Sequence, residues 1–534
     1  MTIEETPVGL AAEGGTGDGD DQPAREPGGG PGGAAVVRAP GRRTRHTAHE
    51  LRRYEALFAA RARSMRSSAM RDMFALTERP DVISLAGGLP DTSTFPPELY
   101  ARLMAQIAAG DTARALQYGP TEGMRAVMDC VVQVMAAEGT AVDREDLIIT
   151  TGGQQVLDLV CKTLIDPGDV IVAEAPTYPG AIPAFAAYEA EVIQVEMDDD
   201  GLPPDALEET LVELERAGKR PKLIYTIPNF QNPAGVTMSL ERRRRLIEIA
   251  RERELLVLED NPYGLLRYEG DALPTLYSLD ASNTGRGGAS DFVIYLGTFS
   301  KILSPGVRLG WAVAPRPVLE KMNLGKQGAD LCSSPMCQLF VSAYFAEQDG
   351  GRASWLDYVE RLRGLYSTRR DAMVQALESE LGGLATWTHP RGGLFVWATM
   401  EGAVDTTDLL ARSEKVAFVP GRAAYMDGQR GARSMRLNFA GSPERDIREA
   451  VRRIGALIKR DAGLLGALTQ RSQGADGARG GGSPGGGEGA EGDRERRPRD
   501  AAQAGAEGDG ERALADVVEL RRRKDGPRSQ RRKP

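Results

Sequence analysis

The sequence predicts an α/β protein in which helices cover both faces of a mostly parallel sheet. Short runs of β-branched and aromatic residues alternate with helical stretches between about residues 50 and 460. The runs hold few polar residues, as expected for strands buried on both faces of a sheet. They read "DLIIT", "VIVAE", "KLIYTI", "LLVLED" and "FVIYLGT".

The stretches between these strands have the spacing of amphipathic helices. Residues 154–165, "QQVLDLVCKTLI", and 240–254, "LERRRRLIEIARERE", repeat apolar residues every three or four positions. From about residue 341 the pattern changes to two long amphipathic helices with the strands "GGLFVW" and "SMRLNFA". We therefore expect a large domain over 97–340 and a smaller α+β domain over 341–460.

Both ends of the chain lack the composition of a folded domain. Val36 and Val37 are the only branched or aromatic apolar residues from Ala11 to Glu50, and ten of the twenty residues from Gly474 to Asp493 are glycine. Such segments bury too little apolar surface to offset the entropy lost on ordering. We expect disordered tails at 1–49 and 461–534, the second ending in a solvated basic stretch.

Composition excludes several classes of function. The chain has 67 basic and 76 acidic residues, a net charge of −9, which gives no general attraction to nucleic acid or to an anionic membrane. Three histidines and four cysteines without a CxxC pair argue against a metal site, and we expect none. No basic leader precedes an apolar run, so a cytoplasmic protein without membrane contact is expected.

Polar residues follow each predicted strand at its carboxyl end. They are found in "TGGQQ", Thr177-Tyr178, "NFQNPAG", "DNPYG" and "TFSK". Singly each has a structural explanation: an aspartate after a strand is commonly a helix cap, and a lone lysine is commonly solvated. Because parallel strands end at one edge of the sheet, the loops should meet there. An anion cradle, an aromatic ring, an amide, an acid and a lysine together describe a pyridoxal 5′-phosphate (PLP) site.

The stretch "YLGTFSKILSPGVRLGW", residues 295–311, sharpens this interpretation. Lys301 and Arg308 lie seven residues apart in a nearly uncharged run. A buried ammonium is costly unless it is paired or chemically used. Either both cations are on the surface, or the lysine is the functional centre of the run.

With these motifs the chain resembles the class I/II aminotransferases, fold-type I PLP enzymes, and most closely the branch with 2-aminoadipate and aromatic aminotransferases. The resemblance covers about Met70 to Ile458. It rests on "ISLAGGLPD", "LQYGPTEG", "QNPAG", "DNPYG", "TFSKILSPGVRLG", "KQGADL" and "RGGLFVW". It implies that 97–340 binds PLP and that 50–96 is an arm contributing to the small domain and the substrate site.

The resemblance also assigns roles around the cofactor. Lys301 would form the Schiff base, and Asp260 would pair with the pyridine nitrogen. Arg308, Thr298, Ser300 and the backbone of Gly153 and Gln154 would hold the phosphate, although many relatives have serine in place of Gly153. Tyr178 would stack on the ring, while Asn232 and Tyr263 would bond its hydroxyl oxygen.

Substrate and partner residues follow from the same resemblance. Arg436 would bind the substrate α-carboxylate as a bidentate pair, with Gly88 and Asn232 beside it. Arg71 would either hold a distal carboxylate or lie on a helix surface. Tyr118 would reach the phosphate of a neighbouring subunit, which implies a homodimer with shared sites.

The implied reaction is amino transfer in amino acid metabolism, from 2-aminoadipate, an aromatic or a branched-chain amino acid to a 2-oxo acid such as 2-oxoglutarate, by a ping-pong mechanism. A PLP-dependent lyase or decarboxylase would use the same lysine, acid and arginine, since a fold does not fix a reaction. A PLP-binding sensor of the transcription-regulator type is a further alternative. Its winged-helix module needs roughly 70 residues with an apolar core, which residues 1–50 do not contain.

Overall fold

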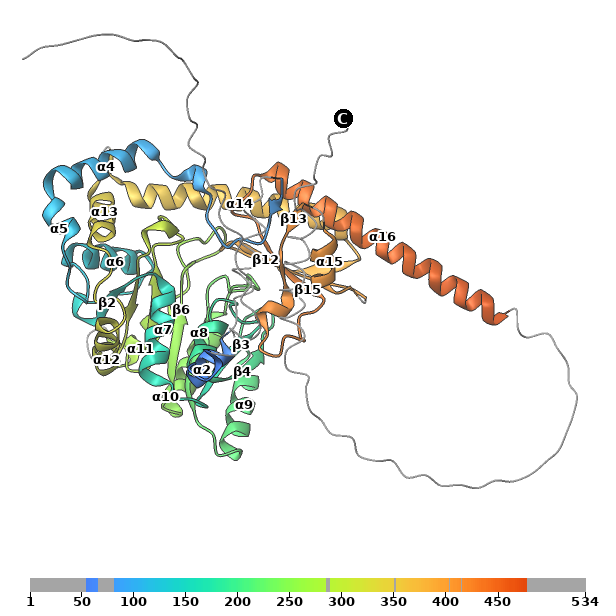
Figure 1. Cartoon of the computed structure of the whole chain (residues 1–534), viewed down its shortest axis with the longest axis horizontal. Coiled ribbons are helices and arrows are strands. Elements are labelled where there is room, and N and C mark those ends of the chain that lie inside the picture. The colour runs from blue at the N-terminus through green and yellow to red at the C-terminus, as the bar shows by residue number, and fades with distance from the viewer. Residues whose placement is uncertain are drawn as a thin grey trace, which may run out of the picture. The chain divides into compact units, whose positions relative to one another are not determined.

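The computed structural model describes residues 54–65, 81–284, 289–349, 352–402, 404–413 and 415–477 (Figure 1). Arg71 and the predicted tail at 1–49 lie outside these ranges. Within them, no helix combines the length and the apolar character that crossing a membrane requires.

A seven-stranded mixed sheet forms the centre of the larger α/β part. Its order is β2-β8-β7-β6-β5-β3-β4, and β8 alone runs antiparallel to its neighbours. The strands are β2 (Leu147–Thr150), β3 (Val170–Ala175), β4 (Glu191–Glu196), β5 (Pro221–Thr226), β6 (Leu256–Asp260), β7 (Val293–Thr298) and β8 (Gly310–Val313). The predicted parallel arrangement is therefore confirmed for the strands that lead into the polar loops.

Alternation along the strands divides the apolar side chains between two cores. Val257 and Val293 face one cluster, whereas their neighbours Leu258 and Ile294 face the other. The first face is covered by α4 (Pro97–Gly110), α5 (Thr112–Leu116), α6 (Arg125–Ala137), α9 (Pro204–Arg216), α10 (Leu240–Glu252), α11 (Leu276–Thr284) and α13 (Pro335–Ala346). The second is covered by α7 (Gly153–Leu164), α8 (Ile182–Ala187) and α12 (Arg316–Gln327). Both faces are thus dry, which explains the nearly continuous apolar runs.

A smaller antiparallel sheet, in the order β11-β12-β15-β14, has its own apolar core. Its strands are β11 (Ala385–Trp387), β12 (Phe395–Met400), β14 (Val419–Pro420) and β15 (Ser434–Asn438). It packs with α14 (Ser354–Leu381), α15 (Thr406–Arg412) and α16 (Glu444–Gly477). Minor elements are α2 (Ala60–Ser64), β1 (Ile83–Ser84), β9 (Gln348–Asp349), β10 (Arg352–Ala353) and β13 (Val416–Ala417). We propose that the two sheets correspond to the predicted large and small domains.

Two predicted boundaries differ from the structure. The division at residue 340 cuts through α13, whose Leu339 and Phe345 pack in the core of the larger part. Helix α16 continues to Gly477, so 461–477 is helical where we expected tail. Residues 461–477 include several alanines, leucines and glutamines, which favour helix and extend α16 past its last turn on the core.

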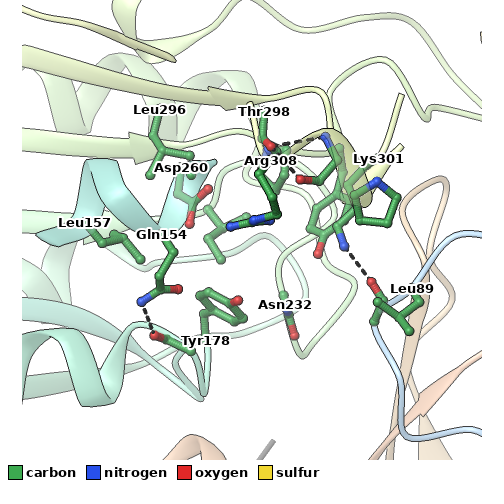
Figure 2. Close-up of a pocket in the computed structure, with 18 of the residues that line it drawn as sticks. Leu89, Gln154, Leu157, Tyr178, Asn232, Asp260, Leu296, Thr298, Lys301 and Arg308 are labelled. Atoms are coloured by element: carbon green, nitrogen blue, oxygen red, sulfur yellow. Dashed lines mark hydrogen bonds between the residues drawn. The ribbon is translucent and has the colours of Figure 1, made fainter. Parts of the chain in front are cut away.

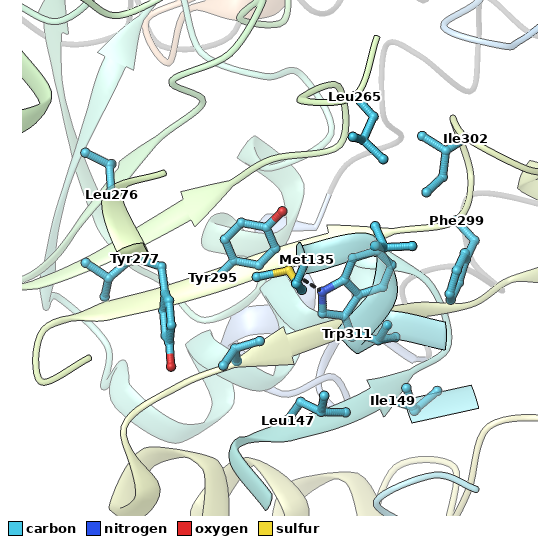
Figure 3. Packing of buried hydrophobic residues seen from close by; sticks show 14 of the residues in the cluster. Met135, Leu147, Ile149, Leu265, Leu276, Tyr277, Tyr295, Phe299, Ile302 and Trp311 are labelled. Carbon is cyan, nitrogen blue, oxygen red and sulfur yellow. Dashed lines mark hydrogen bonds between the residues drawn. The ribbon is translucent and has the colours of Figure 1, made fainter. Parts of the chain in front are cut away.

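Trp311 of β8 lies at the centre of the first core (Figure 3). Its side chain is 2% exposed, its ring packs 5.0 Å from that of Phe299, and its Nε1 donates to the sulfur of Met135 at 3.4 Å. A Cβ on the facing Gly297 would lie 2.2 Å from the indole. The glycine therefore makes the space that the tryptophan fills.

We predict that Trp311→Ala lowers the free energy of unfolding by about 3–5 kcal/mol, because it leaves a large cavity in a closed core. Denaturant unfolding followed by circular dichroism measures this. Leu324→Ala, at a side chain that is 57% exposed, is the control and should change stability by less than about 0.5 kcal/mol. Equal effects of the two substitutions would contradict the packing described here.

Candidate active site

A cavity of about 540 Å³ opens where β6 and β7 end and α7 begins (Figure 2). Every predicted site residue within the described ranges, except Tyr118, lines it. These residues are Gly88, Gly153, Gln154, Tyr178, Asn232, Asp260, Tyr263, Thr298, Ser300, Lys301, Arg308 and Arg436. Residues far apart in the sequence thus meet at one edge of the sheet, as the strand ends predicted.

Lys301 lies in the turn that follows β7, and its amine points into the cavity. Its Nζ donates a hydrogen bond of 2.5 Å to the carbonyl oxygen of Gly88. Burial, together with the positive charges of Arg436 and Arg308, lowers the pKa of Lys301 to about 8, against the opposing effect of Asp260. About a tenth of this amine is therefore neutral, and nucleophilic, at pH 7, far more than for a lysine with the usual pKa near 10.4.

An anion cradle forms where the amino terminus of α7 meets Arg308. Gly152 caps the helix with φ of +80°, and a Cβ there would lie 2.5 Å from a guanidinium nitrogen of Arg308. Arg308 has a left-handed backbone (φ 51°) and donates to the Thr151 carbonyl at 3.4 Å. Free helix N–H groups next to a guanidinium suit a phosphate dianion.

Hydroxyl groups complete the cradle on the side of the lysine turn. Thr298 Oγ1 donates to Ser300 Oγ at 2.9 Å, and the backbone N–H of Ser300 donates back to Thr298 Oγ1 at 3.1 Å. This pairing fixes both hydroxyls at the wall of the cavity.

Gly153 fits its surroundings as glycine. A Cβ at this position would lie 3.0 Å from Cδ2 of Leu296, which also lines the cavity. A serine would require Leu296 to move by a few tenths of an ångström. The glycine at position 153, where a serine was expected from the resemblance, is therefore matched to the position of the Leu296 side chain.

Asp260 is the buried acid of the site, with 5% exposure. Burial raises its pKa to about 6, while a hydrogen bond from the Tyr225 hydroxyl (2.7 Å) and the charge of Lys301 act in the opposite direction. A cation such as a protonated pyridine nitrogen would satisfy this carboxylate. The sequence interpretation missed Tyr225, although the parallel pairing of Tyr225 with Leu258 puts it diagonally beside Asp260.

Arg436 on β15 brings the smaller sheet to the cavity. Its guanidinium donates to Asn232 Oδ1 at 2.9 Å and to the Ala86 carbonyl at 2.6 Å, and it lies 4.3 Å from the ring centre of Phe395. Its side chain is 1% exposed, and burial lowers its pKa to about 10. It therefore stays charged at neutral pH and is held in a fixed orientation.

The remaining predicted residues form the walls. Tyr178 lies against Gly180, where a Cβ would come within 2.4 Å of the phenol oxygen. Gln154 donates from its side chain to the Gly180 carbonyl at 3.0 Å (Figure 2). Burial raises the pKa of Tyr263, so it stays a neutral phenol beside Asn232. These contacts keep the aromatic residues in place around the cavity.

Among the predicted residues that the structure describes, Tyr118 is not brought to the cavity. The Tyr118 side chain is 77% exposed and does not line it. Arg71 lies outside the described residues. The roles given to both stay predictions.

The residues present fit PLP. The cavity offers a cradle for a phosphate, a buried carboxylate for a protonated ring nitrogen and an amine of lowered pKa for an aldehyde. Gly152 leaves no space for a side chain in this cradle.

Comparison with known proteins agrees with this geometry. Residues 80–454 match the model of the family "Aminotransferase class I and II". The chain is 42% identical to aromatic-amino-acid aminotransferase 1 of Thermococcus litoralis, over 76% of this chain and 95% of that protein. A kynurenine aminotransferase structure from Pyrococcus horikoshii, solved with PMP, is similar at a TM-score of 0.70 and 41% identity, covering 77% and 99% of the two chains. An alpha-aminoadipate aminotransferase structure from Thermus thermophilus, complexed with N-(5′-phosphopyridoxyl)-L-leucine, is similar at a TM-score of 0.69 and 37% identity. The match covers 77% of this chain and 99% of that one.

The chain belongs to the class I and II aminotransferase family. It is a PLP-dependent aminotransferase of fold type I. This membership supports amino transfer over the lyase and sensor alternatives.

We predict that the rate of covalent attachment of PLP to the apo-protein rises with pH, with a midpoint near pH 8. The reason is that the attacking amine of Lys301 must be unprotonated. Absorbance after mixing measures the rate at each pH. Arg436→Gln removes a positive charge that lowers this pKa, so its midpoint should move to higher pH. A midpoint near 10.5 in the unsubstituted protein would contradict the electrostatics described here.

Proposed function

We propose that this enzyme transfers the amino group of an L-amino acid (2-aminoadipate, aromatic or branched-chain) to a 2-oxo acid such as 2-oxoglutarate by a ping-pong mechanism. The observation that carries the proposal is the convergence of Lys301, Asp260 and Arg436 on one cavity. The names of the relatives, aromatic-amino-acid, kynurenine and alpha-aminoadipate aminotransferases, support the donor classes.

Arg436 orients the substrate in this proposal. Its guanidinium is already fixed by Asn232 and by the Ala86 carbonyl, so little order has to be gained when a carboxylate binds. A planar fork gives two parallel hydrogen bonds to an α-carboxylate. Gly88 adds backbone close to Lys301, since its carbonyl accepts from Nζ.

Lys301 moves the proton. When bound, PLP supplies an electron sink for the carbon next to the amino group and carries that group between the two half-reactions. Because its pKa is lowered, the Lys301 amine can take the Cα proton of the donor amino acid and, once protonated, can act as the proton donor in the reverse direction. Asp260 keeps a negative charge next to the ring nitrogen, with Tyr225 orienting its carboxylate.

The side-chain end of the substrate site has apolar walls. Leu89 and Ile227 line the same cavity as Lys301 and Arg436. Apolar contacts suit an aromatic or branched side chain. Arg71, in the arm before the described part of the cavity, would pair with the distal carboxylate of 2-aminoadipate or glutamate.

Tyr118 belongs to the proposed homodimer. In one chain its side chain is 77% exposed, and Leu116 beside it is 72% exposed. Exposed apolar side chains next to each other are typical of an interface. We infer that Tyr118 reaches the phosphate cradle of a partner subunit, so that each site is shared.

We predict that the purified enzyme shows the visible absorbance of lysine-bound PLP and loses it on addition of a donor amino acid, as the pyridoxamine form appears. Adding aromatic, branched-chain and 2-aminoadipate donors singly should rank them by rate. Restoration of the lysine-bound absorbance by 2-oxoglutarate would support a ping-pong mechanism.

We predict that Lys301→Ala lowers turnover by at least about 10³-fold, since it removes both nucleophile and base. Normal turnover of that variant would contradict the proposal.

Shared sites predict that two inactive variants complement each other. Mixed dimers of Lys301→Ala and Tyr118→Phe contain one site with both Lys301 and the partner tyrosine intact. Random reassembly makes about half of the dimers mixed, so activity should exceed that of either variant alone and approach about a quarter of that of the unsubstituted enzyme. Mixing Lys301→Ala with Asp260→Asn is the control. Both residues come from the same chain in each site, so the mixed dimer has no intact site and should show no gain in activity. A tyrosine variant with full activity alone, or no gain on mixing, would contradict a shared site.

A further inference from the structure

The motif "KQGADL" has no place in the cavity, yet it contains an ion pair whose lysine is buried. Lys326, near the end of α12, has a side chain that is 0% exposed, and its Nζ contacts Asp330 Oδ1 at 2.6 Å. Asp330 lies in the turn after the helix, where its backbone N–H donates to the Lys326 carbonyl at 3.1 Å. A fully buried ammonium without a partner would be costly, so the pair fixes where the carboxylate lies.

The second oxygen of Asp330 reaches the loop that precedes α7. Asp330 Oδ2 accepts from the Thr151 hydroxyl at 2.6 Å and from the Gln155 side-chain amide at 2.8 Å. Despite partial burial, these donors and Lys326 lower the pKa of Asp330. The carboxylate is thus ionised and holds one donor from the loop before α7 and one from the first turn of that helix.

Thr151 is bound through each of its polar groups. Its N–H donates to Gln155 Oε1 at 2.7 Å, its hydroxyl donates to Asp330, and its carbonyl accepts from Arg308 at 3.4 Å. Gly152 and Gly153, which form the cradle, follow it directly. The position of their backbone therefore depends on how Thr151 is held.

The turn that carries Asp330 is itself anchored from the other side. Gln338, 0% exposed, donates to the Ser333 carbonyl at 2.8 Å and accepts from the Met124 N–H at 2.7 Å. The Ser333 hydroxyl lies 3.2 Å from that of Thr151. The turn is therefore bonded both to the segment before α6 and to the cradle loop.

From this geometry we propose that Asp330 is a positioning residue for the phosphate cradle, which aims the first N–H groups of α7 and Arg308 at the cofactor phosphate through Thr151 and Gln155. The proposal rests on the proposed function, because it takes the cradle as the phosphate site. It gives the "KQGADL" motif a task beyond ending α12. An ion pair that only stabilised the helix end would have no reason to bond Thr151.

Asp330→Asn tests this, since it keeps the shape and removes the charge. Whichever way the amide turns, its NH₂ group faces either Lys326 or the Thr151 and Gln155 donors. We expect the dissociation constant of PLP from the variant to rise by about 10-fold or more, as is typical for lost hydrogen bonds to a charged group. Titration of apo-protein, followed by absorbance, measures it.

Pyridoxal, which lacks the phosphate, separates positioning from general damage. A cradle effect weakens PLP and leaves the affinity for pyridoxal within about twofold, because both bind Lys301 but only PLP uses the cradle. Equal weakening of both ligands, or no weakening of PLP, would overturn the role of Asp330. If the unsubstituted protein bound PLP and pyridoxal with equal affinity, the cradle would not be a phosphate site. That result would contradict this part of the proposed function and the role of Asp330 together.

Two further variants complete the experiment. Thr151→Val removes only the hydroxyl and leaves the Lys326–Asp330 pair intact, so it should weaken PLP selectively, by a few-fold, even if Asp330→Asn folds poorly. Glu320→Gln is the matched control on α12, where Glu320 pairs with Arg316 at 3.0 Å and both side chains are 61% exposed. It should leave the PLP to pyridoxal ratio unchanged. A change as large as that of Asp330→Asn would contradict the proposal.

Discussion

Repulsion among cations around one cavity is the constraint on which the site depends. Lys301, Arg308 and Arg436 all line it, and Asp260 is the buried carboxylate that faces them. Burial lowers the pKa of Lys301 most, the charges of Arg436 and Arg308 lower it as well, and Asp260 acts in the opposite direction. The same arrangement that makes the lysine a usable base makes the cavity attractive to a phosphate and a carboxylate. Cofactor and substrate bring the negative charge that relieves the repulsion, so the same cations contribute both to affinity and to lysine reactivity.

Holding such charges in place takes a rigid scaffold. The parallel strands supply Asp260 and the lysine turn from neighbouring positions, since β6 pairs with β7. The smaller sheet brings Arg436, which bonds to Asn232 in the loop after β5. In the proposed function, substrate recognition thus spans both sheets, whereas the proposed phosphate cradle belongs to the larger one. A change in how the two sheets pack would alter substrate binding before it altered cofactor binding.

The sequence predicted what is local and periodic. Strand ends located Asp260 and Lys301, and strand alternation explains the two apolar cores. Tyr225 and Asp330 were not predicted, for a physical reason. The contact of Tyr225 with Asp260 depends on the register of two parallel strands. That of Asp330 with Thr151 joins positions 179 residues apart. The local pattern of the chain predicts neither strand register nor long-range packing. Arg436 also lies far from Lys301 in the sequence, and it was predicted from the motif resemblance.

Strand alternation also separates the acid that serves chemistry from the acids that hold loops. Asp260 and its neighbour Glu259 are both buried, but only Asp260 faces the cavity. Glu259 accepts from the backbone of Leu276 and Tyr277 and so fixes the start of α11. Glu174 on β3 accepts from Ile227 N and the Gln231 side chain, in the loop that leads to Asn232. Burial raises the pKa of Glu174 and of Glu259 to about 7, yet neither reaches the cavity. A raised pKa therefore marks the buried strand ends in general, and the side of the sheet on which a carboxylate lies decides which of them can take part in the reaction.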